Sequence, residues 1–152
     1  MKFSTKTLYG LKAVLVLASR FGEGSLSVSQ IAKKEGISVA YLEQILNSLK
    51  RRGLVKSVRG PQGGYVLAKK PSEISLESLF YTLEEKPSAA LNGRLQVTPE
   101  TDEVAIANLM FWGKLKSSLE KGLADVFLKD LLDDARKLKK GKSTASPYTF
   151  NI

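Results

Sequence analysis

An acidic and an amide side chain stand next to each other at Glu43 and Gln44, and a run of cations follows at residues 50–52 and at Arg59. A carboxylate can accept a hydrogen bond from the amino group of cytosine, and a primary amide can pair with adenine. An arginine can enter a narrow minor groove, where the negative potential is strongest. These residue types predict contacts with a nucleic acid, in which Glu43 and Gln44 form hydrogen bonds with bases.

Two short helices joined by a tight turn are expected to position Glu43 and Gln44. Ser27 and Gln30 have the spacing of a capping box at the start of the first helix. Gly36 stands where a left-handed residue would end that helix. Ser38 is expected to cap a second helix over residues 38–52, in which apolar residues recur at spacings of three and four, namely Leu42, Ile45, Leu46 and Leu49. This pattern predicts a helix-turn-helix.

A basic hairpin is expected directly after the second helix. Residues 54–58 and 65–67 predict two short strands, and the glycine-rich sequence RGPQGG lies between them. Gly60 and Gly63 supply backbone freedom at the tip of the hairpin. A helix-turn-helix followed by such a hairpin indicates a winged helix, in which the second helix enters the major groove and the wing contacts the backbone or the minor groove.

The positive charge of the chain is concentrated in the half that contains these motifs. Residues 1–70 hold 13 Lys and Arg against 3 Glu, whereas residues 71–152 hold 11 against 12 acidic residues. Such an excess is typical of a surface that binds the phosphate backbone. We therefore expect nucleic-acid binding, with a protein-interaction winged helix as the alternative.

The chain has no cysteine and no histidine. Disulfides, the usual zinc sites and cysteine-held clusters are thereby excluded, as are nucleophile–histidine arrangements. The adjacent carboxylates Glu84 with Glu85, and Asp133 with Asp134, would not face one another on a helix. We expect neither an enzyme nor a cofactor. No apolar run is long enough to cross a membrane and the charged start does not resemble a signal peptide, so a cytoplasmic location is expected.

The sequence STKTLYGLKAVLVLA, followed by QIAKKEGISVAYLEQILNSLKRRGLVKSVRGPQGGYVL, resembles the bacterial family of winged-helix regulators that contains IscR, NsrR and CymR. The resemblance covers about residues 2–85 and is most specific in YLEQ and in the spacing of GLV.S.RG..GGY. It implies a homodimeric transcription regulator. In cluster-binding relatives the ligating cysteines fall within residues 86–97, where this chain has none, so sensing through a thiolate-held cluster is not expected.

The resemblance also assigns DNA contacts to residues of this chain. The base-reading glutamate of the family matches Glu43, and the start of the first helix approaches the DNA backbone in that family. Tyr9 has the alternative role of an aromatic at the edge of the core, and Glu43 that of a surface helix former. The predicted DNA-binding residues are Lys6, Tyr9, Ser38, Tyr41, Glu43, Gln44, Arg51, Arg59, Gly60, Gln62 and Gly63.

Two further helices are expected to complete the DNA-binding domain. Ser4 caps the first, whose predicted apolar stripe is Leu8, Leu11, Leu15 and Ala18, widened by Val14, Leu17 and Phe21. Ser75 caps the other, which carries Leu76, Leu79, Phe80 and Leu83 on one face.

Thr98 is expected to cap a long helix, with Pro99 at its first position. The helix is apolar around most of its circumference, so it must be covered by its own domain and by something else. A second copy is the simplest cover and would match a palindromic site, while a ligand pocket lined by Phe111 and Trp112 is the alternative. The predicted dimerisation residues are Val104, Ala107, Leu109, Phe111, Trp112, Leu115 and Leu119.

The chain ends in YTFNI after a basic, polar stretch. The cysteine-repressor branch of the family looks similar there, and members of that branch form complexes with O-acetylserine sulfhydrylase. By this resemblance, Tyr148, Phe150 and Ile152 would dock into such a partner. The alternatives are that the tail packs on its own dimer or is disordered.

Together these observations predict a mainly α protein with a winged helix-turn-helix DNA-binding domain over residues 1–85, a loop over 86–97, a long dimerisation helix with a short closing helix over 98–138, and a basic tail over 139–152. The predicted function is a homodimeric regulator, acting as a repressor, that binds double-stranded DNA at a palindromic promoter site. The alternative is an interaction module that acts through its tail and binds DNA without sequence preference.

Overall fold

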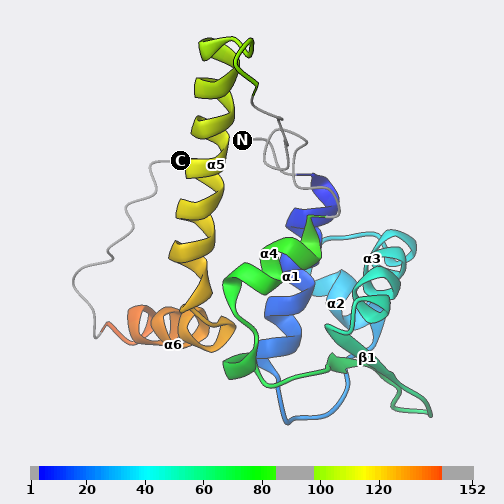
Figure 1. Ribbon diagram of the computed structural model, residues 1–152. Coiled ribbons are helices and arrows are strands. Elements are labelled where there is room, and N and C mark those ends of the chain that lie inside the picture. Colours follow the sequence, from blue (N-terminus) through cyan, green and yellow to red (C-terminus); the bar gives the residue numbers. More distant parts are fainter. Residues whose placement is uncertain (1–3, 85–97, 142–152) are drawn as a thin grey trace.

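The computed structural model describes residues 4–84 and 98–141 and shows a small helical domain from which one long helix projects (Figure 1). Three helices and a two-stranded hairpin come first along the chain, and three further helices follow a short 3₁₀ turn. The elements are α1 Thr5–Ser19, α2 Val28–Glu35, α3 Val39–Arg51, β1 Val55–Val58, β2 Gly64–Leu67, η1 Pro71–Glu73, α4 Leu76–Leu83, α5 Glu103–Ala124 and α6 Leu128–Lys139. A mainly α winged helix-turn-helix with a long C-terminal helix is confirmed.

The predicted helix caps are present. The backbone N–H of Thr7 donates to the Ser4 hydroxyl at 3.0 Å, at the start of α1. The Ser27–Gln30 capping box opens α2, and Gly36 ends it with a left-handed backbone at φ 66°. The side chain of Ser38 then accepts a hydrogen bond at the start of α3. Because each cap depends on neighbouring residues only, the sequence pattern was sufficient to place the helix-turn-helix.

The wing is the antiparallel hairpin of β1 and β2, in which Val55 pairs with Leu67 and Val58 with Gly64. Leu26 extends this small sheet from the connection between α1 and α2. The N–H of Leu26 donates to the Tyr65 carbonyl at 3.0 Å, and the N–H of Tyr65 donates to the Leu26 carbonyl at 2.8 Å. The wing is therefore fixed to the domain along its second strand.

The predicted apolar stripe of α1 was partly wrong. Leu8 and Phe21 are exposed, whereas Val14 and Leu17, expected only at its margin, lie fully inside the core. The N-terminal half of α1 packs on both α3 and α4, and Gly10 is buried where a Cβ would come within 2.6 Å of the Leu83 side chain. A helix that is apolar on nearly every side gives a weak periodic signal, so its inner face could not be read from spacing.

Helix α5 begins at Glu103, and the predicted start at Thr98 was wrong. Asp102 is its N-cap residue, and Thr98 belongs to a separate turn in which its N–H donates to the Thr101 hydroxyl at 2.8 Å. The helix leaves the rest of the molecule as an arm (Figure 1). None of its residues is buried within the single chain.

Helix α6 returns to the winged domain. The N–H of Leu76 donates to the Val126 carbonyl at 2.7 Å, and the N–H of Leu128 donates to the Ile74 carbonyl at 2.9 Å. The Leu128 side chain is 0% exposed and belongs to the same core as α1 and α3. The closing helix is thus part of the winged domain in space, although it follows the arm in sequence.

A polar contact joins the arm to α4. The hydroxyl of Tyr81 donates to Oε1 of Glu120 at 2.8 Å. Burial, together with this hydrogen bond and the Glu120 charge, raises the pKa of Tyr81 to about 12. Tyr81 therefore stays protonated and keeps donating across the physiological pH range.

Candidate nucleic-acid interface

Helix α3 has one buried and one exposed face. Its buried face contains the predicted core residues Leu42, Ile45, Leu46 and Leu49, together with Ser48. Ser38, Glu43 and Gln44 are exposed, as the sequence predicted. Asn47 is also exposed and was not among the predicted contacts, although its spacing of three from Gln44 and four from Glu43 places it on their face.

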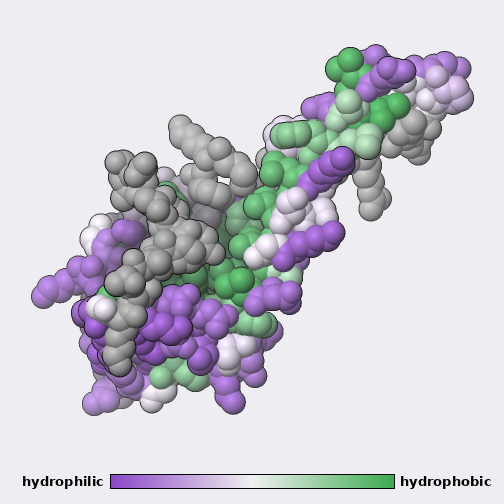
Figure 2. All heavy atoms as spheres, turned by 90° about the vertical axis from the view of Figure 1, so that its left-hand side faces the viewer, coloured by the Kyte–Doolittle hydropathy of each residue, from purple (hydrophilic) through white to green (hydrophobic). Residues whose placement is uncertain are grey.

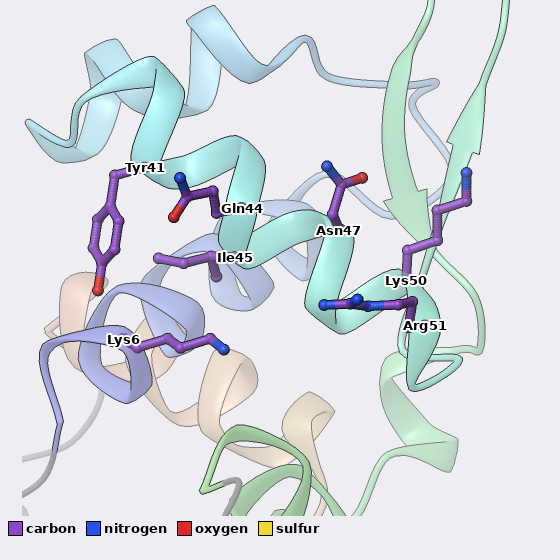
Figure 3. A pocket seen from close by; sticks show the side chains of 7 residues that line it. All are labelled: Lys6, Tyr41, Gln44, Ile45, Asn47, Lys50 and Arg51. Carbon is purple, nitrogen blue, oxygen red and sulfur yellow. The ribbon is translucent and has the colours of Figure 1, made fainter.

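An open hollow of about 840 Å³ lies between the start of α1 and the exposed side of α3 (Figure 3). Lys6 reaches into it from α1, and Arg51 points toward it from the last turn of α3 (Figure 3). The full lining is Lys6, Tyr41, Gln44, Ile45, Asn47, Lys50 and Arg51. Three cations and several hydrogen-bonding groups around one concave surface suit a phosphate backbone that passes beside the helix.

Tyr9 and Tyr41 meet where α1 and α3 cross. Their rings stand edge to face, with centroids 6.0 Å apart, and both side chains are partly buried against the core. The ammonium group of Lys12 lies 5.9 Å from the centre of the Tyr9 ring. Tyr9 therefore has the core-edge position that was one of its two predicted roles, and its contact with phosphate stays a prediction.

The cations at residues 50–52 make different contacts. Lys50 donates to the Ser57 hydroxyl on β1 at 2.7 Å, and Arg51 lines the hollow. The guanidinium of Arg52 donates to the Thr82 carbonyl at 2.8 Å, at the end of α4. Only the first two therefore face the surface that contains Gln44, while Arg52 connects α3 to α4.

The predicted wing residues Arg59, Gly60 and Gln62 are exposed at the tip of the hairpin. The N–H of Gly63 closes the turn by donating to the Gly60 carbonyl at 2.9 Å. The Ser25 hydroxyl donates to the Gln62 carbonyl at 2.6 Å and so holds the tip from outside the hairpin. Arg59 is thereby presented on a short, braced loop.

Two side-chain contacts fix the wing relative to α3, and sequence reasoning did not identify them. One is the Lys50–Ser57 hydrogen bond, and in the other the hydroxyl of Tyr65 on β2 donates to Oδ1 of Asn47 at 3.3 Å. Because the partners lie 7 and 18 residues apart, no local pattern would have revealed them. The two elements expected to contact DNA are thus held in one fixed orientation.

The predicted dimerisation residues lie along α5, and their apolar side chains are exposed or half-buried. Val104 is 73% and Phe111 58% exposed. Ala107 is exposed as well, and Leu109, Trp112, Leu115 and Leu119 are half-buried. Figure 2 shows hydrophobic residues along the projecting arm.

The remaining predicted sites lie outside the described residues. These are the loop over 86–97 and the tail with Tyr148, Phe150 and Ile152, whose docking to O-acetylserine sulfhydrylase stays a prediction. Within residues 4–84 and 98–141, no group of three or more acidic residues could hold a metal ion. No helix in those two ranges has the length and apolar character needed to cross a membrane.

The helix-turn-helix, the braced wing and the cationic hollow together define a winged-helix DNA-binding protein. The family model Rrf2, described as an iron-dependent transcriptional regulator, matches residues 3–134. The chain therefore belongs to the Rrf2 family of transcriptional regulators.

Relatives in sequence and structure agree with this assignment. CymR, an HTH-type transcriptional regulator of Bacillus subtilis, is 34% identical over 131 residues, which is 86% of this chain and 89% of CymR. Protein rrf2 of Nitratidesulfovibrio vulgaris is 31% identical over 149 residues, covering 97% of this chain and 98% of that protein.

Among solved structures, T. potens IscR is 38% identical with a TM-score of 0.71 and covers 96% of this chain and 94% of its own. The structure of CymR, the global cysteine regulator of B. subtilis, has a TM-score of 0.68 at 34% identity and covers 86% of this chain and 95% of its own. The resemblance noted in the sequence is confirmed, and the chain is a DNA-binding transcriptional regulator rather than an enzyme.

Proposed function

We propose that this protein is a homodimeric repressor that binds a palindromic promoter site. In this proposal the exposed face of α3 reads the major groove through Glu43 and Gln44, and the wing inserts Arg59 into the minor groove. The observation that carries the proposal is the position of Gln44 on the rim of a hollow that also contains Lys6 and Arg51. Base-reading and phosphate-binding groups thus share one surface.

The exposed apolar groups of the arm support the dimer. Val104 and Phe111 would remain in water if the chain were monomeric, and apolar patches of this kind mark association surfaces. A two-fold dimer formed along α5 would present two copies of α3, which suits two symmetric half-sites. A dimer seated on a promoter excludes other proteins from it, so repression is the expected direction of control.

Selection of sheared genomic DNA by the purified protein at ~150 mM salt tests the proposal directly. Recovery of a two-fold-symmetric motif upstream of a small set of genes is the expected result. Uniform recovery of all fragments would overturn the proposal, because it would reduce the basic surface to an unspecific electrostatic anchor.

We expect Glu43→Ala to relax sequence preference more than it weakens total binding. The carboxylate is repelled by phosphates unless it reads a base, so its removal would lower discrimination at one base pair of each half-site by about 1–3 kcal/mol. Titration of the selected site and of its single-base variants would measure this change. Glu100→Ala, at another exposed glutamate, should leave the preference intact. If both variants discriminate like the natural protein, Glu43 does not read a base.

We expect Arg59→Ala to weaken binding by about 1–3 kcal/mol per half-site. The loss should include a smaller dependence on salt, because fewer counterions are released from the DNA when a cation is removed from the interface. Binding titrations between 50 and 300 mM salt (a range of about sixfold, wide enough to fix a slope) would show both effects. Lys139→Ala removes an exposed cation from α6, and an equal loss there would mean that Arg59 contributes only general charge.

We expect Phe111→Asp to dissociate the dimer, because it would place a charge within the apolar surface of the arm. Analytical ultracentrifugation should show a monomer at concentrations where the natural protein is a dimer, together with weaker binding to the two-fold site. Ala135→Asp introduces the same charge at an exposed position of α6 and should leave the dimer intact. A Phe111→Asp protein that remains dimeric would place the dimer contact elsewhere.

A further inference from the structure

Two apolar residues lie in the first turn of α3, on the surface proposed to contact DNA. Val39 is 45% exposed, and Ala40 is exposed beside it. The buried face of the helix is complete without them, since its four large apolar residues all follow them along the helix, namely Leu42, Ile45, Leu46 and Leu49. Packing within the chain therefore does not explain an apolar pair at this place.

Helix formation does not explain Val39 either, although it is sufficient to explain Ala40, because alanine is the best helix former. A β-branched residue such as valine is a moderate helix former, and the first turn of a helix favours acidic residues that complement its dipole. The first turn of α3 contains no acidic residue. A side chain that serves neither the core nor the helix is best explained by what the exposed surface contacts.

The spacing places Val39 next to the residues proposed to read bases. Val39 is four residues before Glu43, and Ala40 is four before Gln44, so each pair lies on the same side of the helix in successive turns. The first turn of a recognition helix enters the major groove most deeply. The apolar feature that the major groove offers there is the C5-methyl group of thymine.

We infer that Val39, with Ala40 beside it, contacts the methyl group of a thymine next to the base pair read by Glu43. This inference rests on the proposed function and adds a further contacted base to each half-site. Glu43 selects by a hydrogen bond, and Val39 selects by removing a methyl group from water. Among sites that contain the base pair read by Glu43, Val39 therefore favours those in which a thymine lies next to that base pair.

Replacement of single thymines by deoxyuridine in the selected site tests the inference. Uracil retains the hydrogen-bonding edge of thymine and lacks only the methyl group. We expect one position in each half-site at which the replacement lowers the affinity of the natural protein about fourfold, the value for burial of one methyl-sized group.

The decisive comparison pairs each base change with a protein variant. Val39→Ala should bind the thymine site about fourfold more weakly and should no longer distinguish uracil at that one position. Leu138→Ala, which truncates a similarly exposed leucine on α6, should keep the full sensitivity to uracil. Val39→Ile retains the branched side chain and should also keep the full sensitivity to uracil.

Suppose that a two-fold motif is recovered, but that Val39→Ala changes the effect of uracil at none of its thymine positions. The inference is then wrong and the proposed function stands. If no motif is recovered at all, the proposed function itself fails. A Val39→Ala protein that loses affinity equally for thymine and uracil sites would also overturn the inference, because the lost contact would not involve the methyl group.

Discussion

Leu128→Ala is expected to lower the free energy of unfolding by about 2–5 kcal/mol, the range for truncation of a fully buried leucine. Leu128 is 0% exposed and is the first residue of α6, yet it lies in the core formed by α1, α3 and α4. Its removal would leave a cavity beneath the point where the chain returns from the arm. Urea unfolding at a fixed protein concentration would measure the change, because the stability of a dimer depends on concentration.

Leu138→Ala provides the matched control on the same helix. Leu138 is 47% exposed, so its truncation should change the free energy of unfolding by no more than about 0.5 kcal/mol. Equal losses for the two variants would mean that α6 does not dock on the winged domain through Leu128.

The docking of α6 has a consequence for the arm. The C-terminal end of α5 is attached to the winged domain by two contacts, the Tyr81–Glu120 hydrogen bond and, just beyond the helix, the backbone pairing of Leu128 with Ile74. Two attachments fix the direction of a helix better than one. In the proposed dimer, that direction sets the separation of the two α3 helices and hence the spacing of the half-sites.

The parts of the fold that the sequence predicted best are those determined by neighbouring residues. The Ser27–Gln30 capping box, the left-handed Gly36 and the cap at Ser38 each depend on contacts within a few positions. The start of α5 was predicted wrongly because that prediction also depended on neighbouring residues alone. Thr98 and Pro99 form a good local start signal, but Thr101 satisfies the Thr98 N–H within a separate turn, and the helix begins later.

The exposed face of α3 was also predictable, because its apolar residues recur with a clear helical period. The contacts that orient the interface were not. The hydrogen bonds of Arg52 to α4, of Lys50 to β1 and of Tyr65 to Asn47 join segments that meet only after folding. Arg51 and Arg52 have the same residue type, so the sequence did not indicate that Arg52 would bind α4 while Arg51 faces the hollow.

Gly64→Ala is expected to destabilise the protein by about 2–4 kcal/mol and to weaken DNA binding at temperatures where the variant is still folded. A Cβ at Gly64 would lie 2.2 Å from the carbonyl oxygen of Leu26 and 2.8 Å from the backbone nitrogen of Ser27. These atoms are backbone and cannot move aside as a side chain would. The strand must therefore shift away from Leu26, with loss of the two hydrogen bonds between Leu26 and Tyr65.

The same shift would displace the wing, because β2 carries Tyr65, which also contacts Asn47 on α3. Arg59 would then lose its fixed orientation relative to α3, and affinity should fall for the selected site more than for random DNA. Gly122→Ala is the control: its Cβ would meet nothing within 4 Å, and alanine within α5 should stabilise the helix by about 0.5–1 kcal/mol. Thermal unfolding and binding titrations of both variants would separate the two effects. A Gly64→Ala protein as stable as the natural one would show that the wing is not held against Leu26.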